Sequence, residues 1–204
     1  MLLGLCMFLL VGIVNAANET IFYDGFEKWV VLENCNQNNS GWTACYDGGG
    51  GVATTNNVRK EGVDSLYINN QDAGTGYLIK CLDLTDYSTA YLQFWWDTVG
   101  LDSGEQGNVS INTSSSSYES LFEANNNTVP DLNWNYSDLD ITPYISSDTC
   151  IKFHSQSSLI SEHFRVDEVY IVGEPLPPPQ LNITSISKTS KLTINKGGKL
   201  TISK

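Results

Sequence analysis

The chain has 204 residues, of which 41% are hydrophobic and 11% aromatic, and its formal net charge is −12. A chain of this length and composition can bury the core of one domain, which excludes a wholly disordered protein. The negative charge disfavours a nucleic-acid partner, because a net anion would have to approach a polyanion.

The first sixteen residues have the pattern of an export signal. An apolar run at residues 2–14 leads into Val14-Asn15-Ala16, which has small residues where a signal peptidase cleaves. The run is shorter than the about 20 apolar residues that cross a bilayer, and an uncleaved membrane anchor is the alternative. The lack of Lys or Arg before the run departs from the usual pattern. We expect removal of residues 1–16 and a mature chain, without a transmembrane segment, that is secreted or held at the cell surface.

Four cysteines remain after the signal, and export favours two disulfides. Cys35 and Cys45 are close together in loop-like sequence, whereas Cys81 and Cys150 each lie beside an expected strand. Three pairings are possible, and Cys35–Cys45 with Cys81–Cys150 is the simplest. A metal site at the cysteines is less favoured, because no C-x-x-C spacing occurs and both histidines are distant in sequence.

Asn-x-Ser/Thr sequons predict polar, exposed turns and a glycoprotein in a host that glycosylates. A chain rich in Asn, Ser and Thr contains several by chance, so the excess is modest. The sequons begin at Asn18, Asn38, Asn108, Asn112, Asn126, Asn135 and Asn182.

Residues 17–174 predict an all-β sandwich. Short alternating or apolar runs recur between clusters of Gly, Asn, Asp and Ser, with no sustained helical periodicity. Residues 45–51 and 71–76 are expected to be turns or open loops, and residues 142–144 a corner. The expected strands lie near residues 20–29, 64–69, 76–82, 90–97, 107–113, 117–123, 149–155 and 164–172.

Short landmarks along this region occur in a recognisable order. They are FYDGFE at 22–27, GW at 41–42, GVDSL at 62–66, LDLTDY at 82–87 leading into LQF at 92–94, and FRVDEV at 164–169. In this order they resemble MAM-like and related jelly-roll domains of the concanavalin-like and carbohydrate-binding-module group. The resemblance covers about residues 20–173 and implies a two-sheet antiparallel jelly roll whose first and last strands lie side by side. It implies extracellular recognition or adhesion more often than catalysis.

Patterns typical of catalysis are weak. The chain has no G-x-S-x-G motif, and no motif surrounds either histidine. Asp138 and Asp140 have the i, i+2 spacing of paired carboxylates in glycan hydrolases, but in a Ser/Asn-rich segment without a third acid or an adjacent aromatic strand. We therefore expect a protein that is not an enzyme.

A structural calcium ion is the expected cofactor. Clustered carboxylates bind hard cations, and the resemblance brings the first and last strands together, where related jelly rolls often hold Ca²⁺. The expected ligands are Asp24, Glu27 and Asp167. The alternative is that these acids cap turns and charge strand edges.

Outward-facing aromatic residues indicate carbohydrate binding. If Leu92, Phe94 and Trp96 point inward, alternation places Trp95 and Asp97 outward, and a sugar ring stacks well on an exposed indole. Lys152 likewise faces outward, and Tyr118 and Tyr136 lie near loops beside this surface. The candidate carbohydrate ligands are Tyr91, Gln93, Trp95, His154 and Trp134. The alternatives are a loop that covers Trp95 or a reversed assignment of faces.

The C-terminal segment differs in composition from the rest. Residues 175–180 (PLPPPQ) predict a stiff linker, and residues 181–204 a Lys-rich tail. Residues 1–174 hold six Lys and Arg against all 23 acids, a net charge of −17, whereas residues 175–204 hold five Lys and no acid, a net charge of +5. SKTSKLTI at 187–194 and NKGGKLTI at 195–202 repeat with a period of eight, which favours a β-hairpin or the first coils of a β-solenoid.

Strands in such a tail need a sheet edge. Charge favours an acidic acceptor, so we expect head-to-tail assembly in which the tail of one copy adds to the body of the next, forming filaments unless the assembly closes. The alternative is a flexible basic tether to an anionic cell surface. The leading prediction is a non-catalytic structural or adhesive surface protein, with other copies or cell-surface components as partners. The competing prediction is a carbohydrate-binding module that docks on glycans through exposed aromatics.

Overall fold

The computed structural model describes residues 17–27, 36–37, 41–47, 51–55, 60–62, 64–69, 75–113, 117–125, 133–159, 161–178, 191–194 and 200–203. The predicted signal at 1–16, Cys35, and the sequons at Asn38, Asn126 and Asn182 lie outside these residues. Within them, no helix has the length and hydropathy needed to cross a membrane.

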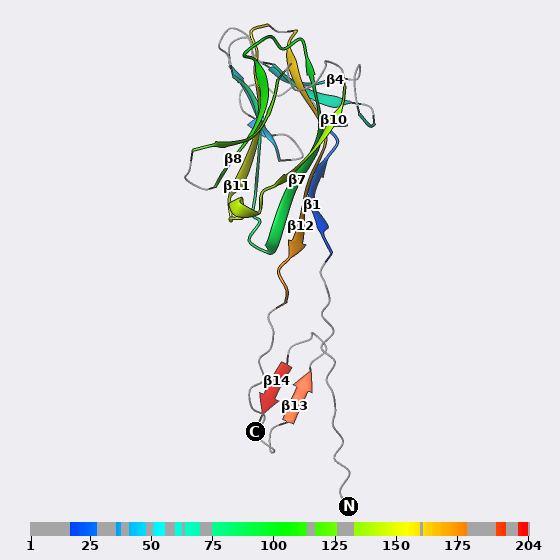
Figure 1. Ribbon diagram of the computed structural model, residues 1–204. Coiled ribbons are helices and arrows are strands. Elements are labelled where there is room, and N and C mark those ends of the chain that lie inside the picture. Colours follow the sequence, from blue (N-terminus) through cyan, green and yellow to red (C-terminus); the bar gives the residue numbers. More distant parts are fainter. Residues whose placement is uncertain are drawn as a thin grey trace, which may run out of the picture.

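Two antiparallel sheets form the sandwich (Figure 1). Sheet A has the strand order β10-β7-β12-β5-β4, and β1 also pairs with β12. Its strands are β1 (Glu19–Asp24), β4 (Gly51–Thr55), β5 (Ser65–Asn69), β7 (Tyr87–Val99), β10 (Asn135–Asp140) and β12 (His163–Pro175). Sheet B has the order β2-β3-β6-β11-β8-β9. Its strands are β2 (Asn36–Gln37), β3 (Thr43–Asp47), β6 (Thr75–Leu82), β8 (Gln106–Thr113), β9 (Glu119–Ala124) and β11 (Thr149–Gln156).

This arrangement confirms the predicted all-β, two-sheet jelly roll. The first strand of the sandwich pairs antiparallel with its last, so that Asp24 lies opposite Val169. In Figure 1, β8 and β11 lie in one layer, and β7, β12, β1 and β10 lie in the other. Each sheet therefore has one face on the core and one outer face.

The core lies between the sheets. Phe94 of sheet A meets Phe153 of sheet B edge to face, with ring centroids 5.3 Å apart. Because successive residues of a strand point to opposite faces, burial of alternate residues fixes the outer face of each central strand. The predicted inward residues are all buried: Leu92, Phe94 and Trp96 in β7, and Ile151 and Phe153 in β11.

Several polar strands differ from the sequence-based expectation. Residues 45–51, expected as a turn, instead contain the end of β3 and the start of β4. Asp138 and Asp140, expected away from any aromatic strand, lie in β10, which pairs with β7. Strand β10 is an edge strand whose residues alternate between half-buried and exposed. Its sequence therefore lacks the apolar alternation that marks a strand.

The cysteines and the corner agree with prediction where the structure describes them. Cys81 and Cys150 form a disulfide between β6 and β11. Cys45 is also disulfide-bonded, and its predicted partner Cys35 lies outside the described residues. The expected corner is a short 3-10 helix, η1 (Thr142–Tyr144).

The C-terminal repeat forms two strands, β13 (Lys191–Ile194) and β14 (Leu200–Ser203). They pair antiparallel, with Leu192 opposite Ile202. This is the hairpin form of the two arrangements that the repeat predicts. Strand β12 continues to Pro175, and the Leu176 N–H donates to the Asp86 carbonyl over 2.8 Å. The sandwich thus extends slightly past the predicted boundary at residue 174.

Candidate functional site

The residues predicted to bind carbohydrate lie on opposite sides of the sandwich. Tyr91, Gln93 and Trp95 lie on the outer face of sheet A, because the alternate residues of β7 fill the core. His154 lies on the outer face of sheet B, because its neighbour Phe153 is buried between the sheets. The structure therefore brings three of the predicted residues together and separates His154 from them.

The outer face of sheet A carries an aromatic pair around Trp95. The Trp95 and Tyr136 rings lie 5.3 Å apart, and Tyr136 is 49% exposed. The Lys60 ammonium lies 4.1 Å from the centroid of the Trp95 ring, so a lysine partly covers the indole. Trp134 is half-buried directly before β10, and its indole N–H is buried without a hydrogen-bond partner in the described part of the chain.

A second aromatic pair on this face is fixed by one carboxylate. The Tyr23 and Tyr170 rings stack with their centroids 4.6 Å apart. Both hydroxyls donate to the Glu168 carboxylate, each over 3.0 Å. Burial and this carboxylate raise the pKa of the Tyr23 hydroxyl well above its ordinary value. The contacts hold Glu168 in place and use both of its oxygens.

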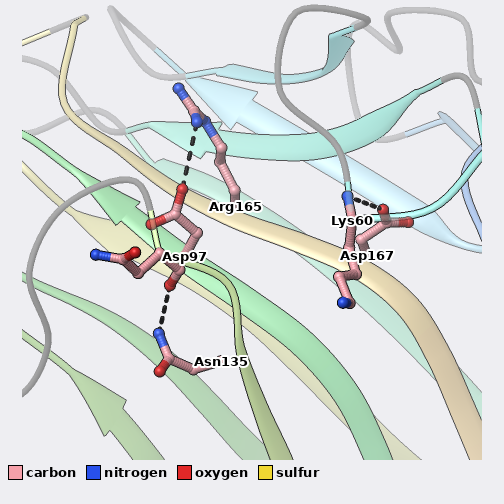
Figure 2. Close-up of polar contacts among 6 residues, drawn as sticks. Lys60, Asp97, Asn135, Arg165 and Asp167 are labelled. Atoms are coloured by element: carbon pink, nitrogen blue, oxygen red, sulfur yellow. Dashed lines mark hydrogen bonds and ion pairs between the residues drawn. The ribbon is translucent and has the colours of Figure 1, made fainter.

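Charged groups near one end of sheet A are also satisfied internally, as Figure 2 shows. Asp97, expected on the exposed face, is fully buried and forms an ion pair with Arg165 over 3.3 Å. Asp167 is fully buried and accepts hydrogen bonds from the backbone N–H groups of Lys60 at 3.0 Å, Glu61 at 3.3 Å and Glu168 at 2.8 Å. Burial raises the pKa of the Asp167 carboxyl to about 6.

Asp24, one of the expected calcium ligands, fixes the end of β1. Its Oδ1 accepts from the Phe26 N–H over 2.8 Å, and its Oδ2 accepts from the Trp42 indole over 3.0 Å. Phe26 has a positive φ of 57°, a left-handed conformation that these contacts support. Both carboxylate oxygens of Asp24 therefore have a structural role.

The other two expected calcium ligands lie near residues 60–62. A Cβ on Gly62 would collide with Glu27 Oε1, so the Glu27 carboxylate fills the space beside this glycine. Asp167 bonds the backbone of the same segment. In the described part of the chain, the carboxylate oxygens of Asp24, Glu27 and Asp167 do not all lie within 4.8 Å of one another. Calcium binding by these three residues stays a prediction.

The outer face of sheet B presents two rows of side chains across four strands. From β6 to β9, the first row contains Tyr77, His154, Asn108 and Glu123, and the second contains Ile79, Lys152, Ser110 and Ser120. Asn108 and Ser110 point away from the core, because Val109 and Ile111 fill it, yet each is only 4% exposed. Asn108 and Ser110 are therefore shielded from solvent although they lie on the outer face, whereas Ser120 and Glu123 are exposed.

A directed chain of hydrogen bonds begins at His154 in the first row, passes through Ser120 of the second row and returns to Glu123 in the first. His154 Nε2 lies 3.0 Å from Asn108 Oδ1, and Asn108 Nδ2 donates to Ser120 Oγ over 2.9 Å. Ser120 Oγ in turn lies 3.4 Å from Glu123 Oε1. Burial and the nearby Lys152 charge lower the pKa of His154 to about 4, so the imidazole is neutral at pH 7 and donates from Nε2. The chain holds the amide of Asn108 in one orientation.

Lys152, which belongs to the second row, lies between two tyrosines. Its ammonium is 4.4 Å from the Tyr118 ring centroid and 5.8 Å from that of Tyr77. Ser110, its cross-strand neighbour on β8, has a buried hydroxyl without a hydrogen-bond partner in the described residues. This surface thus combines two rings, a cation and fixed polar groups.

Sequence reasoning did not identify Tyr77, Asn108 or Ser110 as part of such a surface. The signal was present in β8, where Asn108 and Ser110 alternate with the apolar residues Val109 and Ile111. Tyr77 lies beside the buried Leu78 in the same way. Face alternation could have placed each side chain outward, but not beside the others.

Among the described sequons, Asn18 is exposed, and Asn112 and Asn135 are half-buried. Asn108 is different, because its amide nitrogen is buried and donates to Ser120. A glycan on Asn108 would require this hydrogen bond to break. Glycosylation at Asn108 is thus incompatible with the folded arrangement.

Comparisons with known proteins bear on the fold. No family model matches the chain, and no curated protein matches it. A xylan-binding domain of carbohydrate-binding module family 22 from Paenibacillus barcinonensis matches with a TM-score of 0.53 and 16% identity, covering 79% of this chain and 99% of that one. The C-terminal family 22 carbohydrate-binding module of Xyn10B from Clostridium thermocellum matches with a TM-score of 0.55 and 14% identity, covering 78% and 96%.

These similar structures are carbohydrate-binding modules with a jelly-roll fold, and the chain covers nearly their whole length. At this level of identity the likeness establishes the fold. It agrees with the carbohydrate-binding-module part of the resemblance that the sequence landmarks indicate. The ligand has to be argued from this chain's own residues.

Proposed function

We propose that this protein is a non-catalytic, exported carbohydrate-binding module and that it binds glycans on the outer face of sheet B. The observation that carries the proposal is the row from His154 to Glu123, whose polar groups are fixed by hydrogen bonds beside Tyr77 and Tyr118. Sugars are recognised by aromatic rings that stack on their apolar faces and by polar groups that are already oriented for their hydroxyls. The jelly-roll fold supports this reading.

The outer face of sheet A, with Tyr91, Gln93 and Trp95, is the competing glycan surface. Its exposed rings favour stacking, and Lys60 lies over Trp95 much as Lys152 lies over Tyr118, so a lysine over a ring does not distinguish the two faces. Its carboxylate Glu168 is already engaged by two tyrosine hydroxyls. We therefore assign the primary surface to sheet B.

The test is glycan binding by two matched aromatic variants. We expect Tyr118→Ala to weaken binding to a panel of neutral and acidic oligosaccharides about tenfold, because it removes a stacking ring. Trp95→Ala should leave the affinity within about twofold. Isothermal titration against the glycan that binds best on an array provides the measurement.

The opposite pattern, with affinity lost only in Trp95→Ala, would move the site to sheet A. Absence of binding to every glycan on the array by a folded protein would overturn the function itself. A thermal unfolding curve for each variant establishes that it is folded.

The C-terminal tail favours a second function, in which the protein is a structural or adhesive component that assembles with other copies. The observation behind it is that β13 and β14 pair with each other, in a segment with a net charge of +5 beside an acidic body. A two-stranded sheet is marginal alone and gains stability by adding to another sheet edge. Such an edge on a second copy would give head-to-tail filaments.

Removal of residues 179–204 tests assembly and leaves β12 complete. We expect the full chain to increase in mass with concentration in light scattering, and the truncated chain to stay monomeric. If both are monomeric over a wide concentration range, the assembly function is wrong, while glycan binding by the sandwich is unaffected.

A further inference from the structure

We propose that the glycan recognised on sheet B is acidic, and that Lys152 together with the Ser110 hydroxyl binds its anionic substituent, a carboxylate or a sulfate. This inference rests on the proposed glycan-binding function and specifies the chemical class of its ligand. Composition alone does not predict a surface that binds anions, since the protein as a whole has a net charge of −12.

The Lys152 ammonium has no anionic partner in the described residues. The cation contacts there are with the rings of Tyr118 and Tyr77, which attract a positive charge but are not carboxylates. Burial lowers the pKa of Lys152. A half-buried charge without a counter-ion is costly, so an anion that arrives here gains more than it would at the surface.

The two buried cations in the described part of the chain, Arg165 and Lys80, each have an acid nearby, although Lys80 also lies over the Phe22 ring. Arg165 pairs with Asp97 over 3.3 Å. The negative charge of Asp24 acts on Lys80 and raises its pKa against the effect of burial. Among the described residues, Lys152 departs from this pattern, which favours a counter-ion supplied by a ligand.

Acids on the same side of the molecule are engaged elsewhere. Glu119 accepts a hydrogen bond from the Tyr144 hydroxyl over 2.8 Å, and Glu123 lies at the end of the chain from Ser120. Asp148 acts electrostatically on Tyr118, but it is not among the influences on the pKa of Lys152. In the described structure, none of these carboxylates forms an ion pair with Lys152.

Ser110 supplies the independent second observation. It is 4% exposed, its hydroxyl has no hydrogen-bond partner in the described structure, and it lies directly opposite Lys152 in the register of β8 and β11. The hydroxyls of Thr98 and Ser155 are also buried without a partner in the described residues, but they lie on the core side of their strands with Trp96 and Phe153, whereas Ser110 faces outward beside Lys152. An oxyanion bound by Lys152 would accept a hydrogen bond from this hydroxyl.

The neighbouring row suits the rest of such a sugar. His154 is neutral and Asn108 is held in one orientation, so these groups offer hydrogen bonds without a second charge. A single cation beside neutral polar groups favours a sugar that carries one anionic substituent at this point.

Matched ligands provide the test. The probes are xylohexaose, a xylo-oligosaccharide of the same length carrying one glucuronic acid, hexagalacturonate and a chondroitin sulfate hexasaccharide. We expect the full-length protein to bind the acidic ligand of its preferred backbone about tenfold more tightly than the neutral one, since a hydrogen bond to a charged group contributes about that factor. Because chondroitin also carries glucuronates, an unsulfated chondroitin hexasaccharide is the control that isolates the contribution of the sulfate.

The variants are Lys152→Met and, as a matched control, Lys60→Met, which removes another lysine that lies over an aromatic ring. We expect Lys152→Met to lose the preference for the acidic ligand, and Lys60→Met to keep it. Ser110→Ala should reduce the preference by about threefold. Lys152→Arg, which keeps the charge, should retain most of it.

Equal affinity of the wild-type protein for neutral and acidic ligands would overturn the inference and leave the proposed function standing. A preference that survives in Lys152→Met would also overturn it, because the anion would then lie elsewhere. Failure to bind any glycan would overturn the proposed function, and the inference with it.

Discussion

The charged groups on the outer faces of the two sheets have different partners. On sheet A, Arg165 is paired with Asp97, Glu168 accepts two tyrosine hydroxyls, and Asp167 accepts three backbone N–H groups. On sheet B, the Lys152 ammonium lies over the Tyr118 and Tyr77 rings without an ion pair, and the Ser110 hydroxyl has no hydrogen-bond partner in the described residues. Both faces carry aromatic residues, so aromatic content does not distinguish them.

The difference lies in the charges, because buried polar atoms without a partner in the described residues occur on both sheets, among them the Trp134 indole N–H beside sheet A and the Ser110 hydroxyl on sheet B. A polar network whose members are all satisfied contributes to stability, and removing one member leaves the others buried and unpaired. A half-buried charge without a described carboxylate partner, as at Lys152, does not stabilise the fold in this way and favours the binding of an anion. Mutations on sheet A should therefore reduce stability, and mutations on sheet B should change binding.

The largest expected effect on stability is that of Asp97→Ala on sheet A. It leaves Arg165 buried without this carboxylate, and we expect the free energy of unfolding to fall by about 3–5 kcal/mol. Urea denaturation with the disulfides intact measures the change. The control is Asp138→Ala, an exposed acid on β10, which should change stability by less than about 0.5 kcal/mol. Similar losses in both variants would contradict the structural role of the ion pair.

A change of pH is expected to have a smaller effect on stability. The effect has opposite signs at Asp167 on sheet A and at His154 on sheet B. The pKa of Asp167 is raised from 3.8 to about 6 in the folded protein, so its contribution to stability increases as pH falls from 6 to 3.8. The pKa of His154 is lowered from 6.5 to about 4, so its contribution is present above pH 6.5 and is lost as pH falls to 4. The two contributions oppose each other across nearly the same range.

Substitution should separate the two. Relative to wild type, His154→Gln should gain on the order of 1–3 kcal/mol of stability between pH 7 and pH 4, and Asp167→Asn should lose a similar amount. Urea denaturation at pH 7, 5.5 and 4 measures both differences. If the difference in stability between each variant and wild type is the same at all three pH values, the pKa values of His154 and Asp167 are not shifted as described.

The smallest effect on stability is expected for Lys152→Met. The variant loses the cation–π contacts, which are worth about 0.5–1 kcal/mol, but it also removes a desolvated charge and keeps an apolar chain of similar size. We expect the free energy of unfolding to stay within about 1 kcal/mol of wild type. A loss of several kcal/mol in urea denaturation would show that Lys152 is a structural residue like Arg165, and would end the contrast between the faces.

Much of the fold is predictable from local pattern. The apolar alternation in β7 and β11 is strong, and it correctly predicts the strands and the inward side of each. The Cys81–Cys150 disulfide is predictable because both cysteines lie beside such strands. Strand β10 is not predictable in this way, because an edge strand of mostly polar residues has no buried face to impose a pattern.

The candidate site is less predictable than the fold. His154 is correctly placed on an outer face, and Trp95 likewise, but the two faces are those of different sheets. The alternation of apolar residues in β7 and in β11 predicts equally clearly that Trp95 and His154 face outward. It contains no local signal that assigns β7 to one sheet and β11 to the other.

The sequence by itself determined that the chain is an acidic, all-β sandwich with a basic repeat tail, and which residues of its central strands face outward. Only the tertiary structure decided that Lys152, Ser110 and Tyr118 lie together on one face, while Arg165 meets Asp97 on the other. The physical reason is that a period of two fixes the face of a strand through burial of its own side chains. The choice of neighbouring strands rests on backbone pairing between distant segments, which any sequence of suitable pattern can form.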